Sequence, residues 1–387
     1  MPDHQNRQVL EIPPRLYSSL TEWRHFLSVP RRNHIAHQWA DLLSTQEFTH
    51  VVLEDTPNNL IGLLRAFAAF PNDENIKAAK QAVESVSITV IEDLSGEENQ
   101  EQREVFGSLP SLLAEAICQM TGLQTISLEL EPFTEEEGLK LYNGTMIGQP
   151  QIIWPEMHSI RMRGRHTLPA GIMCRCDRLK IKVLNLDGWT KSRAFVKAKA
   201  VRNLTRLRLY HRKDQRDDPA NDALDFPSTR RSTWKELRDT SVCVRSLKWI
   251  VIEEEDCDKS NEFPLISDYS KLEGELETVL KGLKRIKPTR LAFTFDYRRF
   301  DSRVIRTDMG AENPTSSRLE SSEIKQWHEL RINYLMGVRK LQEIWIFTHS
   351  ALAFVETRNN DGMVTVERRD LDAETNRSMF PWKLLYM

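Results

Sequence analysis

The chain has 387 residues, of which 40% are hydrophobic and 28% are charged, and its formal net charge at pH 7 is -2. This hydrophobic content excludes a wholly disordered chain, and the balanced charge excludes a general attraction to nucleic acid or membrane surfaces. Because single cores rarely grow beyond about 250 to 300 residues, the length predicts several domains or one elongated repeat array.

The N-terminal segment and the cysteines indicate an intracellular protein. Met1 to Glu11 is polar and lacks the apolar centre of a secretion signal. The sequence contains no run of about 18 apolar residues, so no membrane-spanning helix is predicted. The five cysteines are Cys118, Cys174, Cys176, Cys243 and Cys257. An odd, sparse set is typical of reduced thiols, so we expect a cytoplasmic or nuclear protein that does not bind a membrane.

One short apolar pattern recurs along the chain. It consists of an apolar residue, two residues of any kind, an apolar residue, one residue of any kind, and a final apolar residue. The nine copies begin at Phe48, Val83, Leu123, Met157, Ile181, Leu204, Leu247, Pro288 and Leu341, the copy at Pro288 being the weakest. The last two apolar positions lie two residues apart, so they share one face of a strand. Each copy therefore predicts one short parallel strand that is buried by its neighbours.

The spacing of the copies predicts an irregular array. Only the steps from 157 to 181 and from 181 to 204, which are 24 and 23 residues long, approach a regular repeat length. The other steps must contain inserted helices or loops. The predicted fold class is α/β, an irregular leucine-rich-repeat solenoid with a curved parallel sheet and outer helices. The alternative is a generic α/β domain, in which strands and helices also alternate.

The segments between the copies have helix, loop or turn patterns. Helices are expected over residues 58–70, 108–120, 190–201, 271–283 and 322–336, and polar surface loops over 211–229 and 301–318. The turn-forming residues 359–362 separate two apolar runs, which predicts a hairpin that caps the last repeat. The predicted domains are an N-terminal helical cap over residues 1–46, the solenoid over 47–350, and the capping hairpin and tail over 351–387.

Three segments carry a resemblance to a known family. They are Phe48 to Leu53 (FTHVVL), Val86 to Ile88 (VSI) and Leu109 to Leu130 (LPSLLAEAICQMTGLQTISLEL). Together they resemble fungal F-box/leucine-rich-repeat proteins over about residues 10 to 210. The resemblance implies that an N-terminal F-box binds the Skp adaptor of a cullin–RING ubiquitin ligase. It also implies that the repeats hold the substrate.

The N-terminal segments match the F-box only in part. Ile12 to Leu16 (IPPRL) and Phe26 to Arg32 (FLSVPRR) resemble its opening and a later segment, but Pro13 to Arg31 spans only 18 positions. The F-box is therefore degenerate and shortened. The positions that the resemblance assigns to adaptor binding are Pro13, Pro14, Leu16, Leu20, Trp23 and Leu27. The alternative is an amphipathic helix that caps the first repeat.

No sequence motif predicts catalysis. Phosphate-binding glycine loops, zincin motifs and nucleophile elbows are all absent. Cys174 and Cys176, with His158 and His166 nearby, suggest zinc, but no second cysteine pair follows, which favours ordinary buried thiols. The acidic run from Glu253 to Asp258 is better explained as a solvated loop than as a cation site. We expect a non-enzymatic protein without cofactor or metal.

Residues between the apolar strand positions point onto the opposite, concave face of the predicted sheet. Arginines and aromatics gather there in the middle and late copies, a composition typical of interface hot spots. The predicted partner-binding residues are Arg161, Arg163, Arg206, Arg208, Tyr210, Trp249, Arg290 and Trp345. The alternative is that inserted loops cover this face.

Three functions remain open. The first is a protein-binding adaptor, which the resemblance makes the substrate receptor of a cullin–RING (SCF-type) ubiquitin ligase. The second is binding of an anionic ligand, nucleic acid or an inositol phosphate, unless Asp187, Glu253 and Glu343 neutralise the arginines. The third is a plain interaction scaffold. We expect a monomer outside its complex, with a protein rather than a nucleic acid as its partner.

Overall fold

The computed structural model describes residues 50–68, 74–91, 107–146, 152–164, 168–187, 201–211, 246–254, 267–295, 300–311, 318–348, 352–358, 362 and 364–370. The chain divides into two compact units, which we call unit 1 (Met1–Ile181 with Arg193–Lys197) and unit 2 (Lys182–Ser192 with Ala198–Met387). Both units combine helices with a mostly parallel sheet, so the predicted α/β class is confirmed. The division falls inside the range 47–350 that the sequence predicts as one array.

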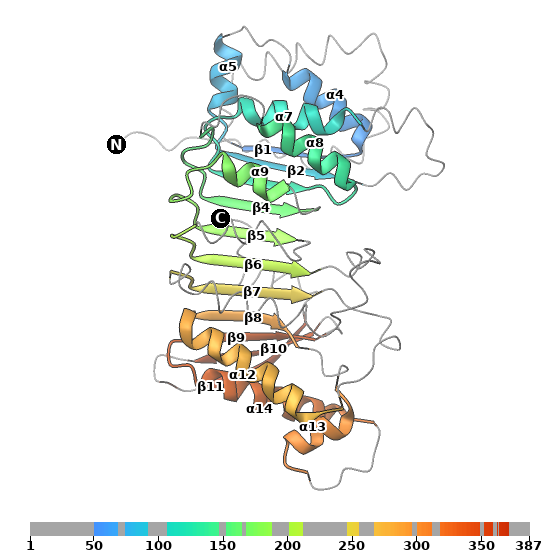
Figure 1. Ribbon diagram of the computed structural model, residues 1–387, viewed down its shortest axis with the longest axis vertical. Coiled ribbons are helices and arrows are strands. Elements are labelled where there is room, and N and C mark those ends of the chain that lie inside the picture. Colours follow the sequence, from blue (N-terminus) through green and yellow to red (C-terminus); the bar gives the residue numbers. More distant parts are fainter. Residues whose placement is uncertain are drawn as a thin grey trace. The chain divides into compact units, whose positions relative to one another are not determined.

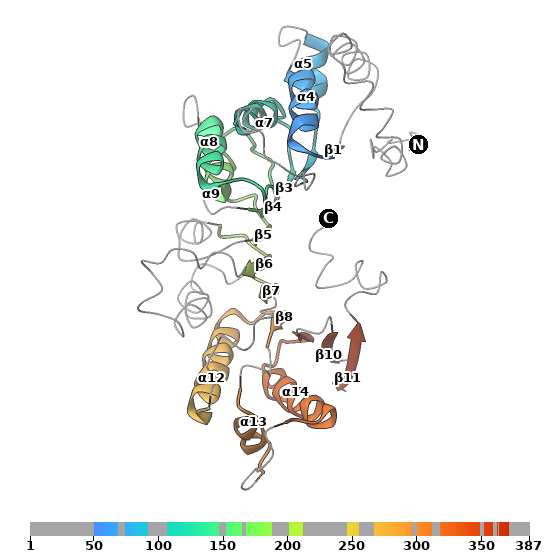
Figure 2. The same cartoon turned by 90° about the vertical axis from the view of Figure 1, so that its right-hand side faces the viewer.

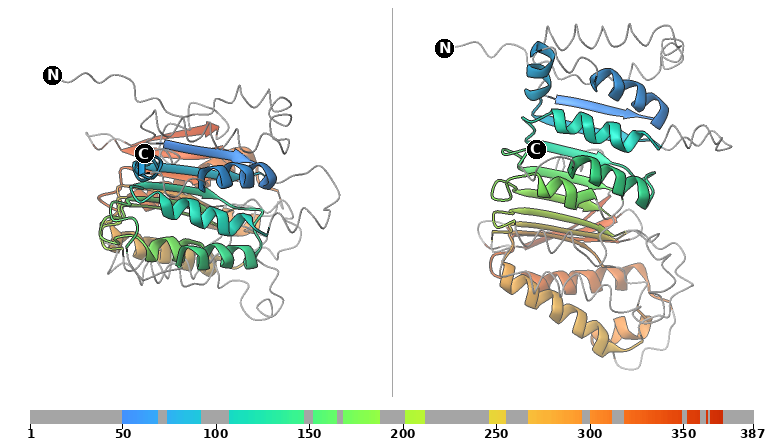
Figure 3. Two further views of the ribbon diagram at one scale, coloured as in Figure 1. Left: turned by 90° about the horizontal axis from the view of Figure 1, so that it is seen from above. Right: turned by 45° about the horizontal axis from the view of Figure 1, so that its top comes forward.

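Unit 1 has a sheet covered by helices on one face (Figures 1 and 2). Its parallel strands are β1 (His50–Asp55), β2 (Ser85–Val90), β3 (Thr125–Glu129) and β4 (Ser159–Arg163), paired in sequence order. Its helices are α4 (Pro57–Ala68), α5 (Glu74–Gln81), α7 (Leu109–Gln119), α8 (Glu135–Met146) and α9 (Leu168–Cys174). Figure 3 shows α7 and α8 on the same side of these strands from two further directions.

The apolar pattern forms the helix-covered face of this sheet. In register, Val86 of β2 pairs with Ile126 of β3, which pairs with Ile160 of β4, and all three side chains are fully buried. Ile88 and Leu128 begin a second buried row two residues farther along. Burial of each such side chain contributes about 1.5 to 3 kcal/mol, so these rows form the core between sheet and helices.

Unit 2 has five parallel strands followed by an antiparallel pair. The parallel strands are β5 (Val183–Asp187), β6 (Arg206–His211), β7 (Trp249–Glu254), β8 (Arg290–Thr294) and β9 (Glu343–Phe347). The antiparallel strands are β10 (Leu352–Arg358) and β11 (Val364–Asp370). The helices are α12 (Tyr269–Ile286), α13 (Ser302–Asp308) and α14 (Ser321–Met336), and α14 packs against β9 and β10. The hairpin predicted from residues 359–362 is therefore present.

The ends of the long helices follow from local chemistry. The Asp268 side chain accepts a hydrogen bond from Ser270 N at 2.9 Å and so begins α12. Lys287 ends that helix in the left-handed conformation, at φ 55°, immediately before Pro288. Glu320 and Glu323 form a capping box at the start of α14. These signals explain why α12 and α14 lie close to their predicted ranges.

One predicted loop is wrong, because residues 301–318 contain the helix α13. Asp301 accepts a hydrogen bond from Arg303 N at 2.8 Å and caps the helix, and Val304 and Ile305 are buried. Tertiary burial of two apolar residues stabilises a helix too short to form alone. The cap over 1–46, the helix over 190–201 and the loop after His211 lie outside the described residues.

No helix in the part of the chain that the structure describes is long and apolar enough to cross a membrane.

Candidate functional site

In unit 1, the sheet face turned away from the helices is polar. Strand alternation places there the residues between the buried apolar positions. They are mostly half-buried hydroxyl and charged residues: Ser85, Ser87, Thr89, Thr125, Ser127, Glu129, Ser159, Arg161 and Arg163. We call this surface the polar face of unit 1.

The two arginines of this face have carboxylate partners in unit 1. Arg161 Nη2 lies 2.5 Å from Glu129 Oε1 on the neighbouring strand. Arg163 Nη1 lies 3.8 Å from Glu129 Oε2 and 3.8 Å from Glu131 Oε1. Ion pairs of this kind hold the arginine side chains against the sheet and reduce the positive potential that an anionic ligand would meet.

In unit 2, Trp249 lies between two arginines on the equivalent face. Register places Arg206 of β6 and Arg290 of β8 on either side of it. The guanidinium carbon of Arg206 is 4.1 Å from the centre of the indole ring, and that of Arg290 is 4.7 Å away. Trp249 remains half-buried and packs against the apolar cluster beside it. We call Arg206, Trp249 and Arg290 the arginine–tryptophan row.

The charges of this row are unequal in their surroundings. Arg290 Nε lies 3.0 Å from Glu343 Oε2 on β9. Burial lowers the pKa of Arg206, and the neighbouring positive charge of Arg290 lowers it further. The row places two guanidinium groups beside one aromatic ring, so it suits a partner with an aromatic or carboxylate group better than one with a positive charge.

The prediction that Arg208 is an accessible contact residue is wrong, because Arg208 is buried. Its side chain is 9% exposed, and its Nε donates a hydrogen bond to Glu253 Oε2 at 3.0 Å, with Nη2 bonded to the same oxygen. A buried arginine requires such a partner because desolvation of an uncompensated charge costs several kcal/mol, to order of magnitude. Glu253, predicted to lie in a solvated loop, instead lies within β7 and supplies the carboxylate.

Trp345 is also corrected, because it is fully buried. Its Nε1 donates to Glu343 Oε1 at 2.8 Å, and the guanidinium carbon of Arg369 lies 5.3 Å from the ring centre. Val355 of β10 is its cross-strand neighbour and belongs to the same apolar cluster. The hairpin thus contributes to the cover of this part of the sheet.

The predicted composite site is divided by these positions. Arg161 and Arg163 belong to unit 1, whereas Arg206, Arg208 and Trp249 belong to unit 2. The remaining positions, namely the Tyr210 side chain and the six adaptor-binding residues Pro13, Pro14, Leu16, Leu20, Trp23 and Leu27, lie outside the described residues.

Cys174 and Cys176 lie at the end of α9, where burial and hydrogen bonds hold the chain. Burial raises the pKa of the Cys176 thiol to about 12, and its Sγ donates to Ile172 O at 3.1 Å. Between them, the buried Arg175 donates from Nε to Thr145 O at 2.8 Å, near the end of α8. No group of three or more potential metal ligands occurs among the described residues. Cys176 is therefore a buried thiol, whereas Cys174 is half-buried, and Arg175, which follows α9, connects this segment to the end of α8.

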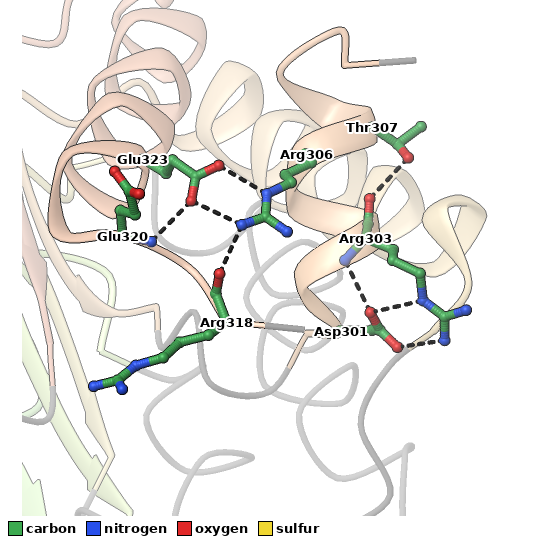
Figure 4. A network of polar contacts seen from close by, with 7 residues as sticks. All are labelled: Asp301, Arg303, Arg306, Thr307, Arg318, Glu320 and Glu323. Atoms are coloured by element: carbon green, nitrogen blue, oxygen red, sulfur yellow. Dashed lines mark hydrogen bonds and ion pairs between the residues drawn. The ribbon is translucent and has the colours of Figure 1, made fainter. Parts of the chain in front are cut away.

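Two polar networks between α13 and α14 were not predicted from the sequence. Arg306 donates to Glu323 from Nε at 2.7 Å and from Nη2 at 3.0 Å, and to Arg318 O at 2.6 Å (Figure 4). These bonds, with Glu320 N, lower the pKa of Glu323 to about 2. The second network centres on Asp308, which accepts from Trp327 Nε1 at 2.8 Å and pairs with Arg331 at 2.9 Å. The capping signal at Glu320 was the only available hint.

Comparison with known proteins adds no relative. A scan against protein-family models and a search of curated proteins both find no match for this chain.

Proposed function

We propose that the chain is a non-catalytic, protein-binding module of the leucine-rich-repeat type. In unit 1, consecutive parallel strands bury one apolar pattern against helices and present polar side chains on the opposite face, whereas in unit 2 Trp249 packs against an apolar cluster on that face. Such an arrangement offers a broad surface to a partner, and no group of three or more potential metal ligands occurs among the described residues. The proposal is therefore a partner-binding protein.

The arginine–tryptophan row carries this proposal. Tryptophan and arginine are the residues most enriched at interface hot spots, because they combine large contact area with directed polar groups. Here three neighbouring strands hold Trp249 between Arg206 and Arg290, so little side-chain freedom remains to be lost on binding. A half-buried tryptophan stacked in this way fits a protein contact better than a solvated surface.

The ligase link rests on the resemblance to F-box/leucine-rich-repeat proteins. Under this proposal residues Pro13, Pro14 and Leu16 contact the Skp adaptor, and the repeats hold a protein destined for ubiquitination. A plain scaffold would bind a protein through its repeats but would not bind the Skp adaptor.

The anionic-ligand alternative has less support. Glu129 pairs with Arg161 and Arg163, Glu253 with Arg208, and Glu343 with Arg290. Of the three carboxylates that the sequence pattern names as able to neutralise the arginines, Glu253 and Glu343 do form ion pairs, Glu129 adds a further one, and the side chain of Asp187 lies outside the described residues. The salt dependence of binding separates the two, since phosphate contacts weaken steeply with ionic strength.

Affinity purification of the tagged full-length chain tests the proposal. We expect a protein partner that is retained by wild type and by Lys281→Ala, an exposed helix control, and lost by Arg206→Ala combined with Trp249→Ala. The Skp adaptor should be recovered with all three. It should disappear with Pro13→Ala combined with Leu16→Ala, while the partner remains.

Different failures have different meanings. Recovery of the partner without adaptor or cullin would reject the ligase link and leave a scaffold. Retention of the partner by the double variant of the arginine–tryptophan row would reject the proposed binding face.

A further inference from the structure

Glu356 is a carboxylate at a core position of β10. Its cross-strand neighbours are the apolar residues Ile344 of β9 and Val366 of β11. The side chain shares a strand face with Phe354 and Arg358, two residues away on either side. Phe354 stacks on His328 of α14 at 4.7 Å, and Arg358 donates to Met336 O at the end of α14. Glu356 therefore lies on the face of β10 that packs against α14, and it is fully buried.

The carboxylate of Glu356 has no hydrogen-bond donor among the described residues. Burial raises the pKa of Glu356 to about 7, and the opposing effect of Arg358 is smaller. This distinguishes it from Asp308 and Glu323, which both accept hydrogen bonds from arginines or tryptophan. A buried carboxylate without donors is costly, whereas its neutral form is tolerated.

The other ionisable groups on this face are few. α14 contributes the buried His328, β10 contributes Arg358, and β11 contributes Arg368, which is exposed and pairs with Phe354 in the register. On β9, the residues that pair with Glu356 and Phe354 are Ile344 and Ile346, neither of which is ionisable. The guanidinium of Arg358 is bonded to the carbonyl groups of Met336 and Arg339, which holds it at the C-terminal end of α14 rather than at Glu356.

We propose that Glu356 is a proton-sensitive contact: its neutral carboxyl lets α14 pack on β9 and β10, and loss of the proton favours release of α14. The bond that breaks is the carboxyl O–H, and the proton passes to solvent. In the open state the carboxyl is hydrated and ionises at its ordinary value. Opening therefore becomes more favourable as pH rises from the ordinary value to the raised one, and it then levels off. This proposal does not depend on the proposed partner.

Hydrogen–deuterium exchange of the full-length protein tests the proposal. After correction for the intrinsic pH dependence of exchange, the opening constant for amides of α14 should rise about 30-fold between about pH 5.5 and pH 8.5. Glu356→Gln, which cannot ionise, should show no such rise. Glu367→Gln, which removes an exposed carboxylate from β11, should behave as wild type.

A second variant keeps the test decisive. If Glu356→Gln does not fold, Glu356→Met replaces it, since methionine fills a similar volume without a polar group. An equal pH response of α14 in wild type and in the folded variant would overturn the proposal. A response that vanishes in the variant and persists in Glu367→Gln would support it.

Discussion

Arg206 and Arg208 lie two residues apart on the same face of β6, yet they have different surroundings. Arg206 stacks on Trp249 and remains half-buried. Arg208 is buried and paired with Glu253. The difference comes from the adjacent strand β7. Trp249 lies beside Arg206, whereas the smaller Val251 lies beside Arg208 and leaves the Arg208 side chain within reach of Glu253, two residues farther along β7. At the residue scale, strand alternation determines which face a residue lies on, but the residues on the adjacent strand determine whether it is buried and what it contacts.

The two tryptophans of this sheet should differ in their effect on stability. Trp345→Ala should lower the free energy of unfolding by about 3 to 5 kcal/mol, because the side chain is fully buried. Trp249→Ala should cost about 1 to 2 kcal/mol, because part of the ring is exposed. Urea denaturation of both variants measures the difference. Equal losses would identify Trp249 as a core residue and argue against the proposed face.

Asp308 should be a sensitive position because its side chain is only 1% exposed and pairs with Arg331. Asp308→Ala would leave that guanidinium and the Trp327 Nε1 without their acceptor, so we expect a loss of about 3 kcal/mol. Glu329→Ala is the control, since its partner Lys325 is exposed and the pair is weak. A loss for Asp308→Ala no greater than that of the control in urea denaturation would contradict the buried network.

At the element scale, α7 and α8 approach closely at one position. A Cβ placed on Gly144 of α8 would lie 2.6 Å from the Cβ of Ala114 on α7. Alanine favours helices by about 1 kcal/mol over glycine, but this clash forces the helices apart. Packing, rather than helix propensity, therefore sets the residue at this position.

Gly144→Ala should destabilise the protein by about 1 to 3 kcal/mol. Combining it with Ala114→Gly should restore part of the loss, because the second change removes the opposing Cβ. Thermal or urea unfolding of the two single variants and the double variant gives the coupling energy. Strictly additive effects would mean that these two positions do not contact each other.

The same scale shows which elements could be predicted. Strands with period-two patterns and helices with capping residues were found close to their true positions, as for α12 and α14. α13 is not predicted from the sequence because its seven residues are mostly polar and its capping residue Asp301 does not by itself indicate a helix. Its Val304 and Ile305 become stabilising only when packed against other elements.

At the scale of the whole molecule, the chain contains two compact units. Each unit has its own rows of buried residues between sheet and helices. Local perturbations should then remain within the unit that contains them.

Hydrogen–deuterium exchange measures this independence. Gly144→Ala should raise exchange in α7, α8 and the adjoining strands of unit 1, and Asp308→Ala should do so in α12 to α14 of unit 2. Each variant serves as the control for the other. A uniform rise across both units in either variant would show that the chain unfolds as one cooperative body.

The sequence by itself determined the parallel strands, the apolar row that each buries on one face, and the final hairpin, because alternation and turn chemistry act over a few residues. Only the tertiary structure decided which polar residues on the opposite face are accessible. Arg208 and Glu253 are 45 residues apart in sequence, and Trp345 is buried beside a hairpin that follows it in the chain. Glu356 likewise looks like an ordinary polar strand residue until α14 covers it. Pairing between distant segments sets burial, and burial sets the charge and role of each side chain.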